Sequence, residues 1–212
     1  MIVAIVGADG AGKTTVTRAV AEALGGSATV ADRWDIIDNP EYPFADFIKP
    51  DERRVRTCAV RMAPKSRVMF LLWAAVASVT DRQSPPDPAE VLLLDGYWMK
   101  HAAGEIAYGM EPPWVEAVGA GLPPADIVVY LRSDPETAWE RMGERAVPYE
   151  CGLDMSCSKE SFLSHQQKIH EVLDTWADRF GWTVVDAHEA FPVVVDTVLE
   201  HVRAHEHEKA AA

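Results

Sequence analysis

The sequence predicts an α/β fold built on one parallel sheet of five strands with helices on both faces. Short β-branched apolar runs alternate with longer segments of helical periodicity. The strand candidates are apolar at nearly every position, which is typical of strands covered on both faces. The 212 residues contain no internal repeat and no linker long enough to divide them. We therefore expect a single domain over residues 1–205, followed by a disordered tail at 206–212.

The first half of the chain contains two strand candidates and two helix candidates. Ile2–Val6 is entirely apolar, and the helix predicted at 12–24 ends where Gly25 and Gly26 follow it. Ala28–Ala31 is the second strand candidate. Residues 66–80 are apolar on nearly all sides, which predicts a helix buried under the sheet.

The second half continues the alternation. A helix predicted at 134–145 begins at a Ser133 or Asp134 cap, with Pro135 in its first turn. A polar segment at 146–158 separates this helix from the next one. The remaining elements are strands at 91–94, 127–131 and 182–185 and helices at 159–180 and 191–203.

Charge and composition restrict the partners and the compartment. The chain has 20 Lys and Arg against 33 Asp and Glu, a net charge of −13 that disfavours nucleic acid and anionic membranes. A local cluster of donors can still bind one small anion. The longest apolar stretch, 68–79, is shorter than the roughly 20 residues of a membrane span. Three sparse cysteines and the lack of a basic leader before residue 7 predict a cytoplasmic protein.

A phosphate-binding loop follows the first strand, because residues 7–14 match G-x-x-x-x-G-K-[ST]. Such a loop points backbone N–H groups at phosphate, and the following helix N-terminus adds positive potential. Lys13 is predicted to reach the β- and γ-phosphates of ATP, and the Thr14 hydroxyl to bind Mg²⁺. The alternative is a glycine-rich turn that merely begins a helix. The predicted ATP-binding residues are Gly7, Ala8, Asp9, Gly10, Ala11, Gly12, Lys13, Thr14 and Thr15.

The class of reaction follows from what accompanies the loop. The sequence contains no Asn-Lys-x-Asp motif, which disfavours a GTPase, and its length disfavours a mechanical ATPase. Phosphoryl transfer to a small acceptor remains.

Several segments resemble thymidylate kinases across most of the chain. They are DGAGKTT at 9–15, LDGY at 94–97 in place of the family's Asp-Arg-Tyr, IVVYLRSDPETAWER at 127–141 and RFGWTVVDA at 179–187. The resemblance implies the P-loop kinase fold with strand order 2-3-1-4-5. It also implies a mobile lid at about 142–158 and a homodimer formed through a helix such as 66–80.

The resemblance also implies roles for single residues. Asp9 matches a carboxylate that faces the acceptor sugar. Arg141 and Arg145, four residues apart, match lid arginines that neutralise the transferred phosphoryl group; a solvated pair bonded to neighbouring glutamates is the alternative. Asp95 ends a strand and is expected to hold Mg²⁺ through water, or to cap a helix.

Three departures from the family concern the acceptor site. Gly96 replaces the arginine of Asp-Arg-Tyr, although Tyr97 is retained. The family's Phe-Ala-Ala-Asp-Arg appears as residues 73–77, WAAVA, which keeps Trp73 to stack on a base but lacks the arginine. DRWD at 32–35 replaces an arginine and a Glu-Pro. Two of the three arginines that grip the acceptor's phosphate in the family are therefore missing.

Three functions remain open. Lys100 and Arg33 can take over the phosphate, which keeps a nucleoside monophosphate as the acceptor. Alternatively the acceptor is a nucleoside or other metabolite with a hydroxyl, and Asp32 or Asp35 is the general base rather than a loop cap. A nucleotide-binding protein without kinase turnover is the third. All three take a small-molecule ligand.

A structural zinc site in the lid is a weaker hypothesis. Cys151 and Cys157 are followed by His165 and His170. The C-x5-C spacing is wider than usual, and the two histidines are five residues apart on a predicted helix, which splays them. Plain thiols and helix-surface side chains are the alternative.

Overall fold

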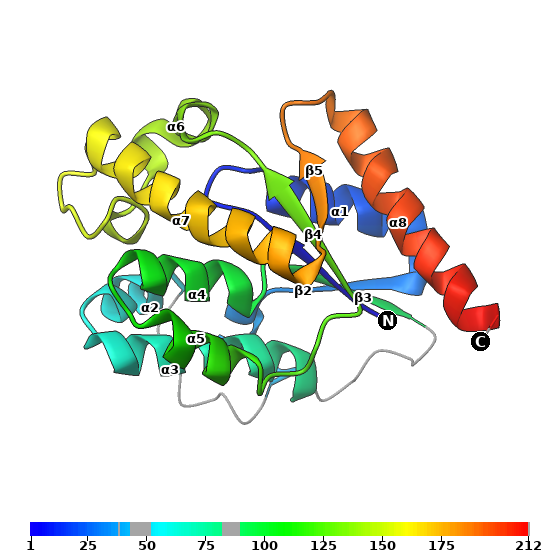
Figure 1. Cartoon of the computed structure of the whole chain (residues 1–212). Coiled ribbons are helices and arrows are strands. Elements are labelled where there is room, and N and C mark those ends of the chain that lie inside the picture. Colours follow the sequence, from blue (N-terminus) through cyan, green and yellow to red (C-terminus); the bar gives the residue numbers. More distant parts are fainter. Residues whose placement is uncertain (38, 43–51, 82–89, 212) are drawn as a thin grey trace.

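The structure is a computed structural model, and it describes residues 1–37, 39–42, 52–81 and 90–211. The centre of the protein is one sheet of five parallel strands in the order β2-β3-β1-β4-β5 (Figure 1). The strands are β1 (Ile2–Val6), β2 (Ala28–Ala31), β3 (Val91–Asp95), β4 (Ile127–Arg132) and β5 (Thr183–Asp186). The predicted fold class and strand order are confirmed. Since β1 lies between β3 and β4, the loop after it opens at the crevice where ligands bind in such sheets.

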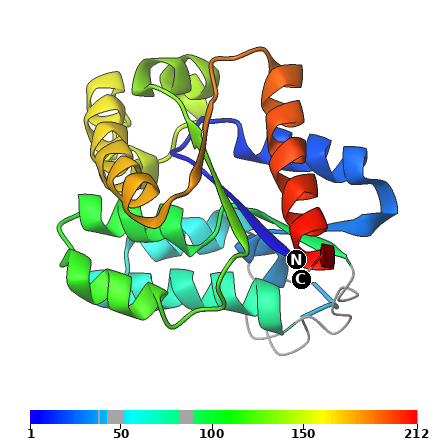
Figure 2. The same ribbon diagram turned by 45° about the vertical axis from the view of Figure 1, so that its right-hand side comes forward.

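Helices cover both faces of the sheet, as Figure 2 shows. One face packs against α1 and α8, and the other packs against α3, α4, α5 and α7. The α-helices are α1 (Lys13–Leu24), α2 (Glu52–Val60), α3 (Pro64–Thr80), α4 (Trp98–Ala107), α5 (Pro112–Gly119), α6 (Pro135–Met142), α7 (Lys159–Phe180) and α8 (Phe191–Ala211). Short 3-10 segments lie at Gly25–Ser27, Arg33–Ile36, Gly143–Arg145 and Pro148–Glu150.

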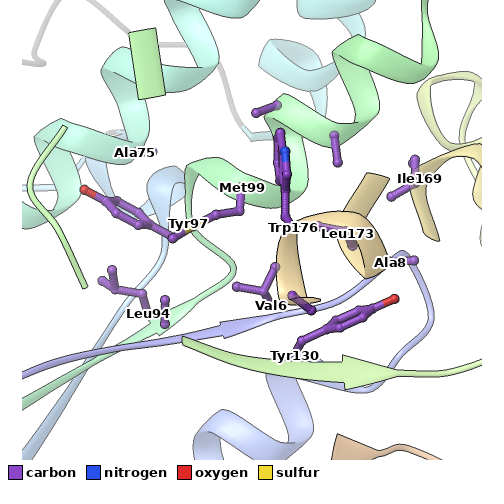
Figure 3. Packing of buried hydrophobic residues seen from close by; sticks show 14 of the residues in the cluster. Val6, Ala8, Ala75, Leu94, Tyr97, Met99, Tyr130, Ile169, Leu173 and Trp176 are labelled. Carbon is purple, nitrogen blue, oxygen red and sulfur yellow. The ribbon is translucent and has the colours of Figure 1, made fainter. Parts of the chain in front are cut away.

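Alternate residues of β1 supply the two halves of the core. Val3 and Ile5 point toward α1 and α8, whereas Ala4 and Val6 point toward α4 and α7. Figure 3 shows Val6 near Trp176 of α7, on the second face. Because every side chain of β1 after Ile2 is buried, the loop that follows starts from a rigid support.

The structure differs from the predicted elements in three places. The helix predicted at 134–145 ends at Met142, and Gly143 at φ +50° begins a 3-10 turn. Helix α8 continues through residues 206–211, which were predicted as a disordered tail, and Val202 of the same helix is completely buried. Helices α2, α4 and α5 were not predicted at all. Within the described residues, no helix combines the length and the apolarity needed to cross a bilayer.

Candidate functional site

The loop after β1 requires glycine at positions where the backbone is left-handed or tightly packed. Gly10 and Gly12 have φ of +81° and +90°, a region that L side chains rarely adopt. A Cβ at Gly10 would lie 2.8 Å from the Cβ of Ala138 in α6. The glycines of the motif therefore shape the loop and seat it against α6.

Lys13, at the first position of α1, lies over the loop. Its Nζ donates a hydrogen bond of 2.8 Å to the carbonyl of Ala8. Burial lowers the pKa of Lys13, and Lys100 acts in the same direction, whereas Asp9 and Asp95 oppose the shift. The loop therefore places an ammonium group over itself, where a bound phosphate would replace the carbonyl as its partner.

A polar cavity of about 420 Å³ opens beside the loop. It brings together half of the residues that the sequence predicted for the site, from the phosphate loop, from the end of β2, from the end of β3 and from α4. Its lining consists of Asp9, Gly10, Lys13, Thr14, Arg18, Asp32, Arg33, Trp34, Asp35, Arg56, Asp95, Gly96, Lys100 and His101.

Asp9 is the most strongly connected carboxylate of this cavity. Its Oδ1 pairs with Nζ of Lys100 at 2.7 Å, and Nε2 of Gln166 donates to Oδ2 at 3.2 Å. Burial alone would raise its pKa, but the ammonium groups of Lys100 and Lys13 hold that pKa far below its ordinary value. Gln166 also donates to the carbonyl of Glu150 at 2.8 Å. Asp9 thus links the phosphate loop to α4 and, through α7, to the segment predicted as the lid.

Asp32 and Asp35 both line the cavity, and they also cap the short 3-10 segment Arg33–Ile36. Oδ1 of Asp32 accepts from the Trp34 amide at 2.8 Å, and Oδ2 of Asp35 accepts from the Asp32 amide at 2.8 Å. The capping interpretation is therefore confirmed. It does not exclude a role toward ligand, because burial raises the pKa of Asp32 despite the nearby Arg33 guanidinium.

Two guanidinium groups flank Trp34 at the cavity wall. The Cζ of Arg33 lies 4.6 Å from the Trp34 ring centroid, and the Cζ of Arg56 lies 5.2 Å from it. Such stacking holds planar cations in place while leaving their N–H edges able to bind an anion. Arg33 was predicted from the sequence, but Arg56 was not.

Sequence analysis missed four polar residues of the site, because none of them belongs to a recognisable motif. Arg56 lies on α2, Arg18 and His101 lie one turn or less from predicted residues on α1 and α4, and Gln166 lies on α7. A signal existed only for His101 and Arg18, since each follows a predicted site residue on the same helix.

Some predicted site residues lie outside this cavity lining. Tyr97 is 2% exposed, and its hydroxyl donates to the Pro123 carbonyl at 2.9 Å, so it lies in the core rather than in the cavity lining. Trp73 packs 6.2 Å from the ring of Phe70 in a cluster that also includes Trp34. Its predicted stacking on a base stays a prediction.

The two lid arginines differ in position. Arg141 donates to the carbonyls of Gly10 at 3.3 Å and Ala187 at 3.1 Å, which joins α6, the phosphate loop and the loop after β5. Arg145 bends back and donates to the carbonyls of Arg141 and Met142. Because α6 ends at Met142, the predicted common helical face of the two arginines does not form.

The structure brings together the two residues predicted to bind magnesium. Thr14 and Asp95 both line the cavity beside Lys13, and hydroxyl and carboxylate oxygens suit Mg²⁺.

The histidines of the zinc hypothesis have other partners. His165 stacks on Tyr108 at 4.5 Å, and Nδ1 of His170 lies 3.0 Å from the Tyr130 hydroxyl. In residues 1–37, 39–42, 52–81 and 90–211, no three or more His, Cys, Asp or Glu side chains form a metal-binding group. The structure therefore does not bring the four residues of the zinc hypothesis together in the described part of the chain.

A second cavity, of about 520 Å³, lies at the carboxyl ends of β4 and β5. Arg132, Asp134, His170 and His188 contribute to its lining. His188 lies between Asp186 and Asp134, and hydrogen bonds to both carboxylates raise its pKa.

Comparison with known proteins supports a kinase fold. Thymidylate kinase from Xylella fastidiosa (strain M12) is 27% identical over 209 residues, which cover 96% of this chain and 88% of the relative. A probable thymidylate kinase from Saccharolobus solfataricus is 24% identical over 203 residues, covering 95% and 96%. No protein-family model matches the chain.

Solved structures agree on the fold. Deoxyadenosine kinase from M. mycoides with bound dCTP superimposes with a TM-score of 0.61 at 17% identity, covering 96% of this chain and all of that chain. The predicted resemblance to thymidylate kinases and the predicted P-loop phosphotransferase are confirmed.

Proposed function

We propose that the protein transfers the γ-phosphoryl group of ATP, with Mg²⁺, to the phosphate of a nucleoside monophosphate. One observation supports this acceptor more than any other. Arg33, Arg56 and Lys100 lie on the same cavity as Lys13 of the phosphate loop. The positions at which the sequence lacks the family's arginines are therefore compensated by cations from other elements.

The charge balance of the cavity points the same way. Five of the lining side chains are cationic (Lys13, Arg18, Arg33, Arg56, Lys100) and four are carboxylates (Asp9, Asp32, Asp35, Asp95). The chain as a whole has a net charge of −13. A cavity that concentrates guanidinium and ammonium groups within so acidic a protein favours an anionic ligand.

The two cavities suit two ligands on either side of the phosphate loop. Arg141 contacts Gly10 in the loop and Ala187 beside the second cavity, so it lies between the two spaces. We assign the second cavity to the remainder of ATP and the first to the acceptor. Lys13 and Arg141 would then neutralise the charge of the transferred group, and a closing lid would exclude water.

Magnesium would be held by the Thr14 hydroxyl and, through water, by Asp95. When bound, the ion supplies charge neutralisation on the phosphate oxygens. An acceptor phosphate is already ionised near neutral pH, so its oxygen attacks without a general base. Under this proposal Asp32 and Asp35 act as caps, and Asp9 positions Lys100.

A kinase of a hydroxyl-bearing nucleoside is the second candidate. The raised pKa of Asp32 at the cavity wall favours it, because a carboxylate of higher basicity is the better acceptor of a hydroxyl proton. In that reaction the hydroxyl oxygen attacks the γ-phosphorus, the proton passes to Asp32 and ADP leaves.

A panel of acceptors distinguishes the two. ATP consumption is measured in the presence of Mg²⁺ with each nucleoside and each matching monophosphate. The proposal expects turnover with at least one monophosphate, and a preference for it over its nucleoside of about 100-fold or more in kcat/KM, because a nucleoside lacks the phosphate that Arg33, Arg56 and Lys100 are proposed to bind. Turnover of unphosphorylated acceptors alone would overturn it.

Substitution of the carboxylates adds an independent test. Asp32→Asn and Asp35→Asn should retain kcat with the best monophosphate, apart from a small loss of stability from the missing caps. A fall of kcat by about 100-fold or more in Asp32→Asn would instead identify it as the general base of the second candidate.

A further inference from the structure

His101 is a buried imidazole in the wall of the acceptor cavity. It lies on α4 directly after Lys100, is 2% exposed and lines the cavity. Neither Nδ1 nor Nε2 has a hydrogen-bond partner among the described residues. Of the buried side chains in that part of the chain, it is the one with two such unpaired atoms.

Leaving these nitrogens unpaired is costly. A buried polar group without a partner costs about 1–3 kcal/mol, whereas an apolar side chain of similar shape would avoid that cost. Ordinary packing therefore does not explain a histidine here. His170 differs, because its Nδ1 is paired with the Tyr130 hydroxyl.

The imidazole of His101 is neutral near physiological pH. Burial lowers its pKa well below the ordinary value, and the charges of Arg33, Lys100, Lys13 and Arg56 shift it in the same direction. A neutral imidazole offers one N–H donor and one nitrogen acceptor. It is therefore suited to an uncharged polar group, while the neighbouring guanidinium and ammonium groups are better partners for phosphate.

We propose that His101 is a specificity-determining residue that hydrogen-bonds an uncharged polar group of the acceptor, such as a hydroxyl or the edge of a nucleobase. The inference rests on the proposed function, because it assigns the first cavity to the acceptor. Binding then pairs a nitrogen that is unpaired in the free protein, and an acceptor without the matching group leaves it unpaired. Discrimination follows from that difference.

Kinetics of two variants test the proposal. His101→Phe keeps a planar ring without nitrogens, and His101→Gln keeps a donor and an acceptor. We expect His101→Phe to lower kcat/KM for the best acceptor by about 10- to 100-fold, mainly through KM, and to reduce discrimination among acceptors. The KM for ATP should stay within about twofold, and His101→Gln should recover part of the loss. His207→Phe, an exposed position on α8, is the matched control.

A stability measurement separates this role from packing. The melting temperature of His101→Phe should equal or exceed that of the natural protein, because the substitution removes unpaired polar atoms. If His101→Phe retains kcat/KM within about twofold for every acceptor that the natural protein uses, the proposal is wrong. Absence of turnover in the natural protein would instead contradict the proposed function.

Nitrogen NMR of the unmodified protein gives an answer that needs neither turnover nor a folded variant. The histidine ring nitrogens are labelled with ¹⁵N, and the spectrum is titrated with each nucleoside and monophosphate of the panel. We expect a ring nitrogen of His101 to shift with a bound acceptor and to stay unchanged with a non-hydrolysable ATP analogue alone. A spectrum in which no panel compound shifts His101 overturns the inference.

Discussion

Asp9 and Lys100 form a nearly buried ion pair, with Oδ1 of the carboxylate 2.7 Å from Nζ of the ammonium. The pair joins the phosphate loop to α4, so the loop residues and the α4 residues that line the cavity are linked directly. Burial removes water from both charged groups, and each group interacts with the other in place of that water. The position of α4 relative to the phosphate loop therefore depends on this contact.

Removing one partner of the pair should disturb the site. Lys100→Met leaves a buried carboxylate beside Lys13, and we expect kcat/KM for the acceptor to fall by about 10- to 100-fold. In a double-mutant cycle with Asp9→Asn, the coupling energy from kcat/KM should be about 0.5–3 kcal/mol. Lys168→Met, at an exposed position on α7, is the control. Additive losses would show that the pair does not act as a unit.

Lys13→Ala tests whether the phosphate loop catalyses a reaction or only binds a nucleotide. Loss of the ammonium group should reduce kcat by about 100-fold or more, because it removes a positive charge that is proposed to neutralise the transferred phosphoryl group. The rate of ATP consumption with the best acceptor is the measurement. Lys159→Ala removes an exposed lysine that pairs with Glu136, and it should leave the rate unchanged. Equal rates in natural protein and Lys13→Ala would contradict the catalytic role of Lys13, and no turnover in either would favour the binding protein without turnover.

The buried pair of Arg67 and Glu105 should dominate the stability of the α3–α4 interface. Arg67 donates to both carboxylate oxygens of Glu105, at 2.7 and 2.8 Å, and both side chains are almost fully buried. Glu105→Gln should lower the free energy of unfolding by about 3–5 kcal/mol, because it leaves the buried guanidinium without a counter-charge. Glu136→Gln breaks an exposed pair and should cost less than about 1 kcal/mol. Urea denaturation measures both, and similar losses would contradict the prediction.

His165 should make the fold sensitive to acid. Burial lowers its pKa to about 4, so between about pH 6.5 and 4 the unfolded chain binds a proton that the folded chain does not. The stabilisation due to neutral His165 is complete above that window and is lost as the pH falls through it. Relative to His165→Asn, the natural protein should lose about 3 kcal/mol of unfolding free energy from pH 7 to 4.

The difference between the two proteins is the quantity to measure, because Glu150 has the opposite effect. Burial raises the pKa of Glu150 to about 7, which stabilises the folded state as the pH falls. This contribution is present in both proteins. If the stability of the natural protein and of His165→Asn changes in parallel between pH 7 and 4, His165 takes up a proton equally in the folded and unfolded states. That result would contradict the prediction.

The sequence by itself determined the fold class, the five strands and the phosphate loop. These are local properties: continuous apolar runs such as Ile2–Val6, helix periodicity and a contiguous motif whose glycines are needed for the backbone conformations of the loop itself. The resemblance to thymidylate kinases added the strand order, which periodicity cannot supply. Helices such as α4 were missed because their burial is set by contacts with α7 rather than by an amphipathic pattern.

Only the tertiary structure decided which residues share the cavity beside the phosphate loop. Arg56 and His101 lie far from each other and from the loop in sequence, and the packing of α2 and α4 at the carboxyl edge of the sheet brings them together. It likewise placed Tyr97 in the core and separated Arg145 from the face of Arg141. The physical reason is that hydrophobic packing fixes where each helix lies, and the polar side chains of a site take whatever positions that packing assigns them.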